Sequence, residues 1–534
     1  MRSLLKLLTV GGVLGLFGCQ TTASDTQSGV AALEAVDTII QGGQIFDGSG
    51  GAGWSGDIAL QGDRIVYVGS DAAARYDAGT VIDARGLIVA PGFIDPHTHA
   101  GSDLASGNSD RRANLPFAFQ GVTTVVVGND GFGSHEIGGM ATEARRQMIG
   151  TNAAYLVGFG SVREAVLGKE NRPPLAVELT QMEDLTRAAM CEGAWGLSAG
   201  LYYVPQTYAE TDEVVALARI AGEFGGYYDT HMRDESTYNI TVTGALSETL
   251  EIGRAANLPV HIAHIKALGP AVWGHSARMI AMIDEARAGG QRVTADQYPW
   301  EASGTRVSNA LVPRWALEGG LSSLRDRLAN ADTLQSIRGE MIEAIARRGG
   351  PDRLLITGRL GGSNAPLGKT LADFAQTDDL DPVDAAIAIL TAGDARVASF
   401  NMSEADIAAF AGQDWVVTGS DGSNGHPRKY ASFPKAYRDL VVSGDMDLAR
   451  FIRRSSGQTA DIIGLKRRGY LKAGHFADIA VFDPASFAPN ATYSAPRELS
   501  SGVIHLFVNG SQMIRDETYT GALPGRPLMK DTQC

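Results

Sequence analysis

Cysteine is scarce in this chain, with three residues among 534. Cys19 closes an apolar N-terminal run, so only Cys191 and Cys534 remain in the body of the protein. Two cysteines do not make the disulfide framework of a small secreted domain. Cys191 ends a stretch with a helical pattern, and we expect it to be a packed thiol. No cysteine ends a predicted strand, where a catalytic nucleophile would be expected.

An excess of positive charge is also missing. Asp and Glu outnumber Lys and Arg by 60 to 46, the formal net charge is −14, and the basic residues are scattered. This distribution argues against a nucleic-acid-binding surface. The apolar run of residues 7–17 is too short to cross a bilayer. The length of 534 residues is enough for one large domain and a smaller one, and the 44% of hydrophobic residues can build a large core.

The N-terminus has the pattern of an export signal. Arg2 and Lys6 precede the apolar run, and the letters LFGC at residues 16–19 resemble a bacterial lipobox. In a lipobox the cysteine is lipidated and becomes the new N-terminus, and Gln20 then fits sorting to the outer membrane. An ordinary signal peptide is the alternative. We expect a signal peptide and lipobox in 1–19, a flexible tether in 20–36, and an outer-membrane lipoprotein that faces the periplasm.

The two ends of the body resemble each other in composition. Short alternating runs punctuated by Gly and Asp occupy residues 37–90, and similar runs return between residues 477 and 510. We expect both ends to pair into one small β-sandwich, with the central segment inserted between them. The predicted division is a first sandwich segment in 37–90, a barrel in 91–455 and a second sandwich segment in 456–534.

Strand-like and helical stretches alternate in the central segment, which predicts a parallel sheet. Eight β/α units predict an α/β fold, a TIM-like (β/α)8 barrel with its chemistry at the carboxyl ends of the strands. Between the seventh and eighth strands, residues 298–414 carry amphipathic helical patterns, so we expect a helical insertion that covers the barrel mouth. The predicted strands are 87–97, 122–130, 154–158, 194–199, 226–231, 259–264, 292–296 and 415–421.

Residues that bind metal ions end these strands. His97 and His99 lie on one face of an extended chain, because side chains alternate there, and two such imidazoles can chelate one ion. Two solvated loop histidines are the alternative for this motif alone. Several histidines together with carboxylates form a typical zinc or mixed N/O site. The later strand ends carry Asp130, His231, His264, Asp296 and Asp421.

Six motifs, in order along the chain, resemble the amidohydrolase superfamily and, more narrowly, the N-acyl-D-amino-acid deacylases, or D-aminoacylases. They are FIDPHTH (93–99), GVTTVVVGN (121–129), GLSAGL (196–201), THMR (230–233), AHIK (263–266) and GSDG (419–422). The resemblance runs from about residue 37 to the C-terminus. It implies a TIM-like barrel with an attached β-sandwich, one or two zinc ions, and hydrolysis of an N-acyl-D-amino acid to a carboxylate and a free D-amino acid.

The resemblance assigns ligands by position. His97 and His99 match the first-strand ligands, and His231 and His264 match those of the fifth and sixth strands. Asp421 matches the aspartate that acts as general base and can also touch the metal. Zinc lowers the pKa of water from about 15.7 to about 7. Asp421 is then expected to take the proton of that water and pass it to the leaving amine.

Asp130 departs from the family pattern, which has a cysteine ligand at this place. A carboxylate can also bind zinc and can bridge two ions, although it is harder than a thiolate. Our hypothesis is that Asp130 bridges and that both metal positions fill. In the alternative, Asp130 binds backbone amides while one zinc ion lies on His231 and His264.

A second group of residues is expected to bind the substrate. Lys266 lies two residues after His264 and so shares its face, and a Lys and an Arg around one anion make a suitable carboxylate clamp. The alternative for Lys266 is a surface amine with a packed stem. We expect His261 to be packed toward the helices and His426 to line the mouth. The resemblance assigns the carboxylate of the substrate to Lys266, Tyr298 and Arg428, with Ser303 as a weaker match.

The expected function is thus a zinc-dependent hydrolase acting on the linear amide of an N-acyl amino acid or dipeptide. A dipeptidase or cyclic-amide hydrolase of the same superfamily is the first alternative. The second is a non-catalytic, ligand-binding envelope lipoprotein. The only expected membrane contact is the lipid anchor, no nucleic acid is expected, and the oligomeric state is left open.

Overall fold

The computed structural model describes residues 33–534. The predicted signal peptide, lipobox and most of the tether lie outside the described residues. Strand β1 begins at Glu34, three residues before the predicted start of the first sheet. None of the described helices is long and apolar enough to span a membrane.

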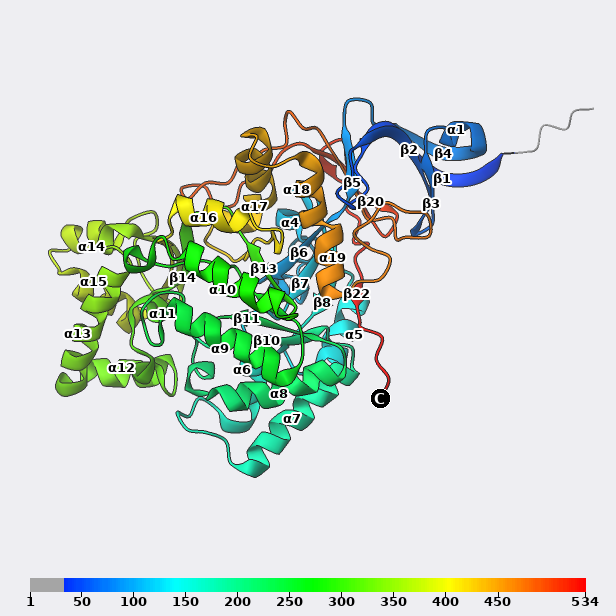
Figure 1. Cartoon of the computed structure of the whole chain (residues 1–534). Coiled ribbons are helices and arrows are strands. Elements are labelled where there is room, and N and C mark those ends of the chain that lie inside the picture. Colours follow the sequence, from blue (N-terminus) through cyan, green and yellow to red (C-terminus); the bar gives the residue numbers. More distant parts are fainter. Residues whose placement is uncertain (1–32) are drawn as a thin grey trace, which may run out of the picture.

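Strands from both ends of the chain share one nine-stranded sheet (Figure 1). Strand β5 joins the two ends, because it pairs in parallel with β1 on one side and antiparallel with β18 on the other. Residues from both ends of the chain, such as Ile40, Ile58 and Ile479, pack in one hydrophobic cluster on this sheet. The strands are β1 (Glu34–Ile45), β2 (Trp54–Gln61), β3 (Arg64–Gly69), β4 (Tyr76–Asp83), β5 (Ile88–Pro91), β18 (Ile479–Phe482), β19 (Val503–Val508), β20 (Ser511–Arg515) and β21 (Thr518–Tyr519).

The central segment, together with β22 from the C-terminal end of the chain, forms two parallel sheets, which confirms the α/β class. One has the order β17-β13-β12-β11-β10-β9 and the other the order β22-β8-β7-β6. Only Leu156 separates β8 from β9, so these two strands together are the predicted third strand. At the other boundary between the two sheets, where β6 lies next to β17, the His99 amide donates to the Gly422 carbonyl over 3.1 Å. The strands are β6 (Phe93–Thr98), β7 (Val122–Val127), β8 (Asn152–Tyr155), β9 (Val157–Gly158), β10 (Gly196–Gly200), β11 (Tyr227–His231), β12 (Val260–Ile262), β13 (Val293–Gln297), β17 (Val416–Thr418) and β22 (Pro527–Leu528).

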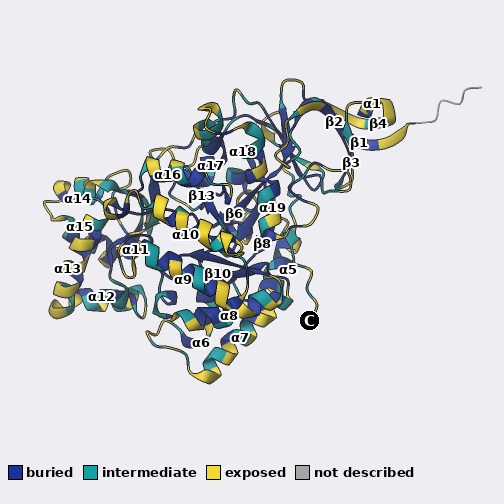
Figure 2. Cartoon of the chain, viewed as in Figure 1, coloured by how far each residue is buried: buried dark blue, intermediate teal, exposed yellow. Residues whose placement is uncertain are grey.

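Amphipathic helices cover these strands, with one face buried and the other exposed (Figure 2). In α9, Val242, Ala245, Leu246 and Thr249 are buried, at the i, i+3, i+4, i+7 spacing of one helical face. The same hydrophobic cluster contains buried residues of the parallel strands, such as Val260 of β12. The main helices are α5 (Ile137–Gln147), α6 (Phe159–Leu167), α7 (Ala176–Cys191), α8 (Thr211–Glu223), α9 (Thr241–Ala256), α10 (Ser276–Ala288), α17 (Arg428–Ala436), α18 (Leu448–Ser455) and α19 (Gly457–Ile463).

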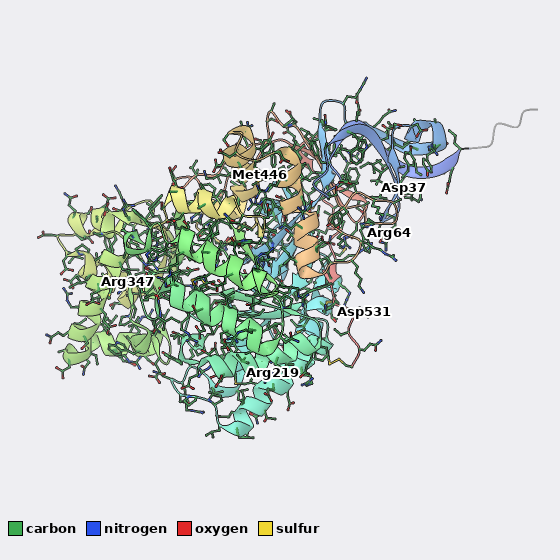
Figure 3. All side chains as sticks on the ribbon, in the orientation of Figure 1. Asp37, Arg64, Arg219, Arg347, Met446 and Asp531 are labelled. Atoms are coloured by element: carbon green, nitrogen blue, oxygen red, sulfur yellow. A yellow bond between two sulfur atoms is a disulfide. The ribbon has the colours of Figure 1, made fainter. Side chains whose placement is uncertain are left out.

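The insertion before β17 has its own hydrophobic core and is not wholly helical. Amphipathic patterns in the insertion form helices such as α12 and α13, and the Asn330 side chain caps α13 by accepting from two backbone amides. The strands of the insertion form an antiparallel sheet of order β14-β16-β15. Arg347 of α13 lies at one end of the molecule, and Asp37 and Arg64 of the nine-stranded sheet lie at the other (Figure 3). The elements are β14 (Ala302–Arg306), α11 (Val307–Leu311), α12 (Leu321–Ala329), α13 (Ala331–Arg347), β15 (Leu354–Leu360), α14 (Leu371–Thr377), α15 (Pro382–Ala392), β16 (Asp394–Phe400) and α16 (Glu404–Ala411).

The expectation that Cys191 is a free packed thiol is wrong. Cys191 forms a disulfide with Cys534, with the two Cα atoms 5.8 Å apart. The last residues of the chain return to the parallel strands, where β22 pairs with β8 and the Trp195 indole donates to the Leu528 carbonyl over 2.7 Å. The two cysteines are 343 residues apart, so no local pattern indicated that they meet.

Candidate metal centre

Six predicted ligands lie at or just beyond the carboxyl ends of parallel strands. His97 is in β6 and His231 ends β11, while His99, Asp130, His264 and Asp421 follow β6, β7, β12 and β17 within three residues. Because the carboxyl ends of parallel strands meet at one edge, residues far apart in the chain converge there. All except His99 are buried.

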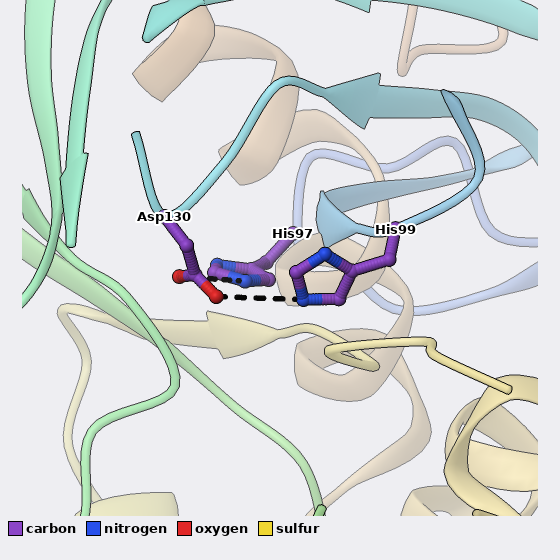
Figure 4. A group of neighbouring side chains, drawn as sticks. All are labelled: His97, His99 and Asp130. Carbon is purple, nitrogen blue, oxygen red and sulfur yellow. Dashed lines mark ion pairs between the residues drawn. The ribbon is translucent and has the colours of Figure 1, made fainter. Parts of the chain in front are cut away.

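The Asp130 carboxylate is the centre of this arrangement, because it contacts all four histidines. Its Oδ1 lies 3.4 Å from His97 Nε2, and its Oδ2 lies 3.5 Å from His99 Nε2 (Figure 4). Oδ1 also lies 3.5 Å from His264 Nε2 and 3.9 Å from His231 Nδ1. Within the described part of the chain, no backbone amide donates to this carboxylate, which is unlike the alternative in which Asp130 binds only backbone amides.

Asp421 approaches the group from β17. Its Oδ1 lies 3.1 Å from His99 Nε2 and 3.7 Å from His97 Nε2. Its second oxygen, Oδ2, lies 2.7 Å from Arg428 Nη1. Asp421 therefore faces histidines with one oxygen and a guanidinium with the other.

The backbone is strained at three of these six residues. Asp130, His264 and Asp421 have φ angles of 58°, 36° and 48°, in the left-handed region that non-glycine residues rarely occupy. Such conformations cost of order 1–3 kcal/mol each and cluster at functional sites. Asp130 and Asp421 each lie three residues beyond the end of a strand, and their carboxylates face the histidines.

The donor set fits a divalent metal ion. Both ring nitrogens of His97 and Oδ1 of Asp130 are buried and have no hydrogen-bond partner. Polar atoms left in this state are costly unless a ligand satisfies them. Three groups have ligand atoms within 4.8 Å of one another: His97, His99 and Asp130; His97, His264 and Asp421; and Asp130, His231 and His264. Imidazole nitrogens with carboxylate oxygens suit zinc.

The electrostatics of the site also favour a cation. Burial lowers the pKa of His97 and of His231 to about 4, which keeps both imidazoles neutral, as metal binding requires. Burial and Lys266 also lower the pKa of His264, but the carboxylates of Asp421, Asp130 and Glu235 outweigh them and raise it to about 10. Carboxylates that favour a proton on His264 also attract a divalent ion.

Comparisons with known proteins identify the family of this chain. A model of the amidohydrolase family matches residues 80–299. The D-aminoacylase of Alcaligenes xylosoxydans xylosoxydans is 33% identical over 92% of this chain and 98% of its own. The chain belongs to the family of N-acyl-D-amino-acid deacylases. This membership favours the deacylase expectation over a dipeptidase, a cyclic-amide hydrolase and a non-catalytic lipoprotein.

Solved structures of the deacylase family resemble the chain over its described length. A D-aminoacylase studied for its binuclear metal centre superimposes with a TM-score of 0.78 at 30% identity, covering 93% of this chain and all of that one. The N-acyl-D-glutamate deacylase of Bordetella bronchiseptica, complexed with zinc and a phosphonate inhibitor that mimics the tetrahedral intermediate, has a TM-score of 0.78 at 29% identity with the same coverage.

In this deacylase-family chain, Lys266 is not a surface amine. It is buried, and its Nζ donates to Glu235 Oε1 over 2.6 Å and to the His264 carbonyl over 2.9 Å. Sequence reasoning missed Glu235, which lies two residues beyond the THMR motif. The available signal was its position four residues after the ligand His231.

Arg428 and Lys266 both lie near the ring of Tyr298. The Arg428 guanidinium is 4.9 Å from the centre of the Tyr298 ring, and Lys266 Nζ is 5.9 Å from it. Ser303 lies on β14 beside Gly304, whose carbonyl accepts from Arg428 Nη2 over 3.3 Å. His426 is buried beside this group, and its Nδ1 accepts from the Arg428 amide over 3.1 Å. The predicted substrate-binding residues therefore gather next to Asp421.

The expectation that His261 packs toward the helices is wrong. Its Nε2 lies 3.1 Å from Asp296 Oδ2, and the same oxygen lies 3.9 Å from Nδ1 of His97. His261 therefore belongs to a buried polar layer next to the first ligand. The prediction extended strand alternation to His264, but β12 ends at Ile262 and the φ of His264 is positive, so alternation stops before the ligand.

Proposed function

We propose that this protein hydrolyses the amide bond of N-acyl-D-amino acids, giving a carboxylate and a free D-amino acid, in a zinc-dependent reaction. One observation carries the proposal: the Asp130 carboxylate lies within 4 Å of four imidazoles, and two buried cations, Lys266 and Arg428, lie beside them. A metal site next to a pair of cations suits a substrate that has an amide close to a carboxylate.

The residues present would hold one or two ions. His97, His99 and Asp421 would hold one, His231 and His264 the other, and Asp130 would bridge them. When bound, zinc polarises the scissile carbonyl and makes a water molecule acidic enough to attack it near neutral pH. The buried histidines hold their ring nitrogens in place for this task.

Asp421 is the proposed general base. Burial disfavours its charge, but Arg428 and His264 lower the pKa of Asp421 below its usual range, so it is a carboxylate. Its Oδ1, which faces His99, accepts the proton of the attacking water, and the same oxygen then delivers that proton to the leaving amine.

Lys266, Tyr298, Arg428 and Ser303 are the proposed substrate-binding residues. Arg428 offers a planar guanidinium that can bind a carboxylate through two parallel hydrogen bonds, while Lys266 acts as a point charge. Each cation already has a carboxylate partner, Asp421 and Glu235 respectively. The substrate carboxylate would therefore join two existing charge pairs.

A substrate panel tests the proposal. The purified protein would be assayed with N-acetyl-D- and N-acetyl-L-amino acids, dipeptides with a D-residue, and cyclic amides. We expect turnover of the N-acetyl-D-amino acids, its loss in excess chelator and its return with zinc. Turnover confined to L-substrates or cyclic amides, or full activity in strong chelator, would contradict the proposal.

We further propose that the parallel strands close into a (β/α)8 barrel. The hydrogen bond from His99 to Gly422 and the continuity of β8 with β9 support closure. We keep the division into β-sandwich segments 37–90 and 456–534 around a barrel of 91–455, with the insertion at about 298–414.

Export as a lipoprotein anchored through Cys19 is proposed from the sequence alone, because Cys19 lies outside the described residues. The Cys191–Cys534 disulfide supports export, since structural disulfides persist mainly in oxidising compartments. Metabolic labelling with a radioactive fatty acid tests the anchor: we expect label on the wild type and none on Cys19→Ser. An unlabelled wild type would contradict it.

A further inference from the structure

Glu235 lies behind the two histidines that face Asp130 from β11 and β12. It is buried, with 4% of its surface exposed. Its Oε2 lies 3.6 Å from His231 Nε2, and its Oε1 lies 3.3 Å from His264 Nδ1. One carboxylate therefore contacts both imidazoles on the side away from Asp130.

Each of these rings turns one nitrogen toward Asp130 and the other toward Glu235. His231 Nδ1 and His264 Nε2 lie 3.0 Å from each other and within 4 Å of Asp130 Oδ1. A neutral imidazole carries one N–H and one lone pair, and a carboxylate accepts only from the N–H. Glu235 therefore favours N–H at His231 Nε2 and at His264 Nδ1, which leaves both lone pairs on the Asp130 side.

Lys266 competes for one of these nitrogens. Its Nζ lies 2.7 Å from His264 Nδ1. If Nδ1 accepted a hydrogen bond from Lys266, the neutral ring would carry its proton at Nε2, on the Asp130 side, where it would block a metal ion. Glu235 opposes this state because it accepts from Lys266 at Oε1.

The loop that carries Glu235 is fixed by its neighbours. Asp234 accepts from the backbone amides of Ser236, Asn239 and Thr241 over 2.7–3.0 Å. The Glu235 carbonyl accepts from the Leu268 amide over 2.8 Å. These hydrogen bonds hold the turn that positions the Glu235 carboxylate. A residue that orients metal-binding histidines is expected to be held in place in this way.

We propose that Glu235 is a positioning residue that sets the tautomer and orientation of both His231 and His264, and thereby the affinity of the Asp130, His231 and His264 group for zinc. This inference rests on the zinc site of the proposed function. Carboxylates that orient ligand histidines in this way change metal affinity by about 10- to 100-fold when they are replaced.

The test compares wild type with Glu235→Gln and Glu235→Asp, using zinc and a competing chromophoric chelator. We expect Glu235→Gln to weaken zinc binding by about 10- to 100-fold. The zinc affinity of Glu235→Asp should lie between those of wild type and Glu235→Gln, because the shorter side chain keeps the charge but reaches only one imidazole ring. With Co²⁺ in place of zinc, the visible spectrum of Glu235→Gln should differ from that of wild type, which a purely structural role would not produce.

Glu213→Gln is the matched control. Glu213 on α8 is also buried, and its Oε1 accepts from Arg163 Nε over 2.9 Å, but it is not among the site residues. Zinc affinity and the Co²⁺ spectrum should be unchanged in this variant. Equal weakening of zinc binding in both variants would show that loss of any buried carboxylate suffices, and would overturn the inference.

A folded Glu235→Gln that binds zinc as tightly as wild type would also overturn the inference and leave the proposed function intact. A wild type that binds no zinc would overturn both. If Glu235→Gln does not fold, ¹⁵N-histidine spectra of the zinc-loaded wild type decide. We expect the proton on Nε2 of His231 and on Nδ1 of His264, and the opposite tautomer at either ring would overturn the inference.

Discussion

Arg428 Nη1 lies 2.7 Å from Oδ2 of Asp421, and both side chains are buried. The cation proposed to bind the substrate carboxylate therefore also holds the proposed general base. Two further contacts fix the guanidinium, to the Gly304 carbonyl over 3.3 Å and to Ser423 Oγ over 3.1 Å. Binding and catalysis are thus coupled through one side chain.

Replacing Arg428 by Met should impair both steps. The variant loses its charged contact with the substrate and its ion pair with Asp421. At about 1.5–3 kcal/mol for each charged contact, kcat/KM should fall by at least about 100-fold. Initial rates on an N-acetyl-D-amino acid should show a higher KM and a lower kcat. Lys429→Met is the control, because Lys429 is the next buried cation on α17 and pairs with Asp103 instead. An unchanged KM in Arg428→Met would exclude the clamp.

Replacing Asp130 by Ala should remove the bridge between the two metal positions. We expect elemental analysis to find fewer zinc ions per chain than in wild type, because this carboxylate is the one that contacts all four histidines. Asp130→Cys should keep one tightly bound zinc ion, since a thiolate is a soft ligand that zinc accepts readily. An unchanged zinc content in Asp130→Ala would rule out a ligand role for Asp130.

Most of the candidate site could be predicted from the sequence, because its residues end strands in a regular β/α alternation. His97, Asp130, His231 and Asp421 lie at the ends of predicted strands, and parallel strands bring such ends to one edge. Glu235 was missed because it lies in a turn whose shape depends on Asp234, and no periodic pattern places a turn residue. His261 was misplaced because strand alternation ends before His264.

The fold was predictable to a similar extent. Apolar runs identified the eight parallel strands of the central segment, and amphipathic patterns indicated the presence of helices in the insertion. The antiparallel sheet β14-β16-β15 was missed because Gly304 and Gly358 interrupt two of its strands, and because its strands pair over distances up to about a hundred residues. The Cys191–Cys534 pairing depends on the whole fold in the same way.

Phe93→Ala should destabilise the protein strongly. Phe93 is fully buried at the start of β6, with ring centroids 5.5 Å from Phe433, 5.7 Å from Phe451 and 6.2 Å from Phe482. Because Phe482 belongs to the nine-stranded sheet, this cluster joins that sheet to the strand that carries His97. The cavity left by alanine should cost about 3–5 kcal/mol. Chemical unfolding measures the loss.

The control for this change is Phe132→Ala. Phe132 is 54% exposed, so the loss of its ring should change the free energy of unfolding by less than about 0.5 kcal/mol. Equal stability losses in the two variants would contradict the assignment of Phe93 to the joining core.

Breaking the disulfide should loosen the C-terminal segment without stopping catalysis. Cys191 ends α7 five residues before β10 begins, so it lies near the amino end of that strand, whereas the metal ligands lie at the carboxyl ends of the strands. The segment would keep the pairing of β22 with β8 and the hydrogen bond from the Lys530 amide to the Gly193 carbonyl, but it would lose its covalent anchor. Cys534→Ser should therefore lower stability by about 2–4 kcal/mol and leave kcat and KM unchanged.

Mass spectrometry of unreduced digests should find the Cys191 and Cys534 peptides linked in wild type, and reductant should lower the Tm of wild type but not of Cys534→Ser. Unlinked peptides in exported wild-type protein would contradict the bond, and a loss of activity in Cys534→Ser would show that the segment influences the site.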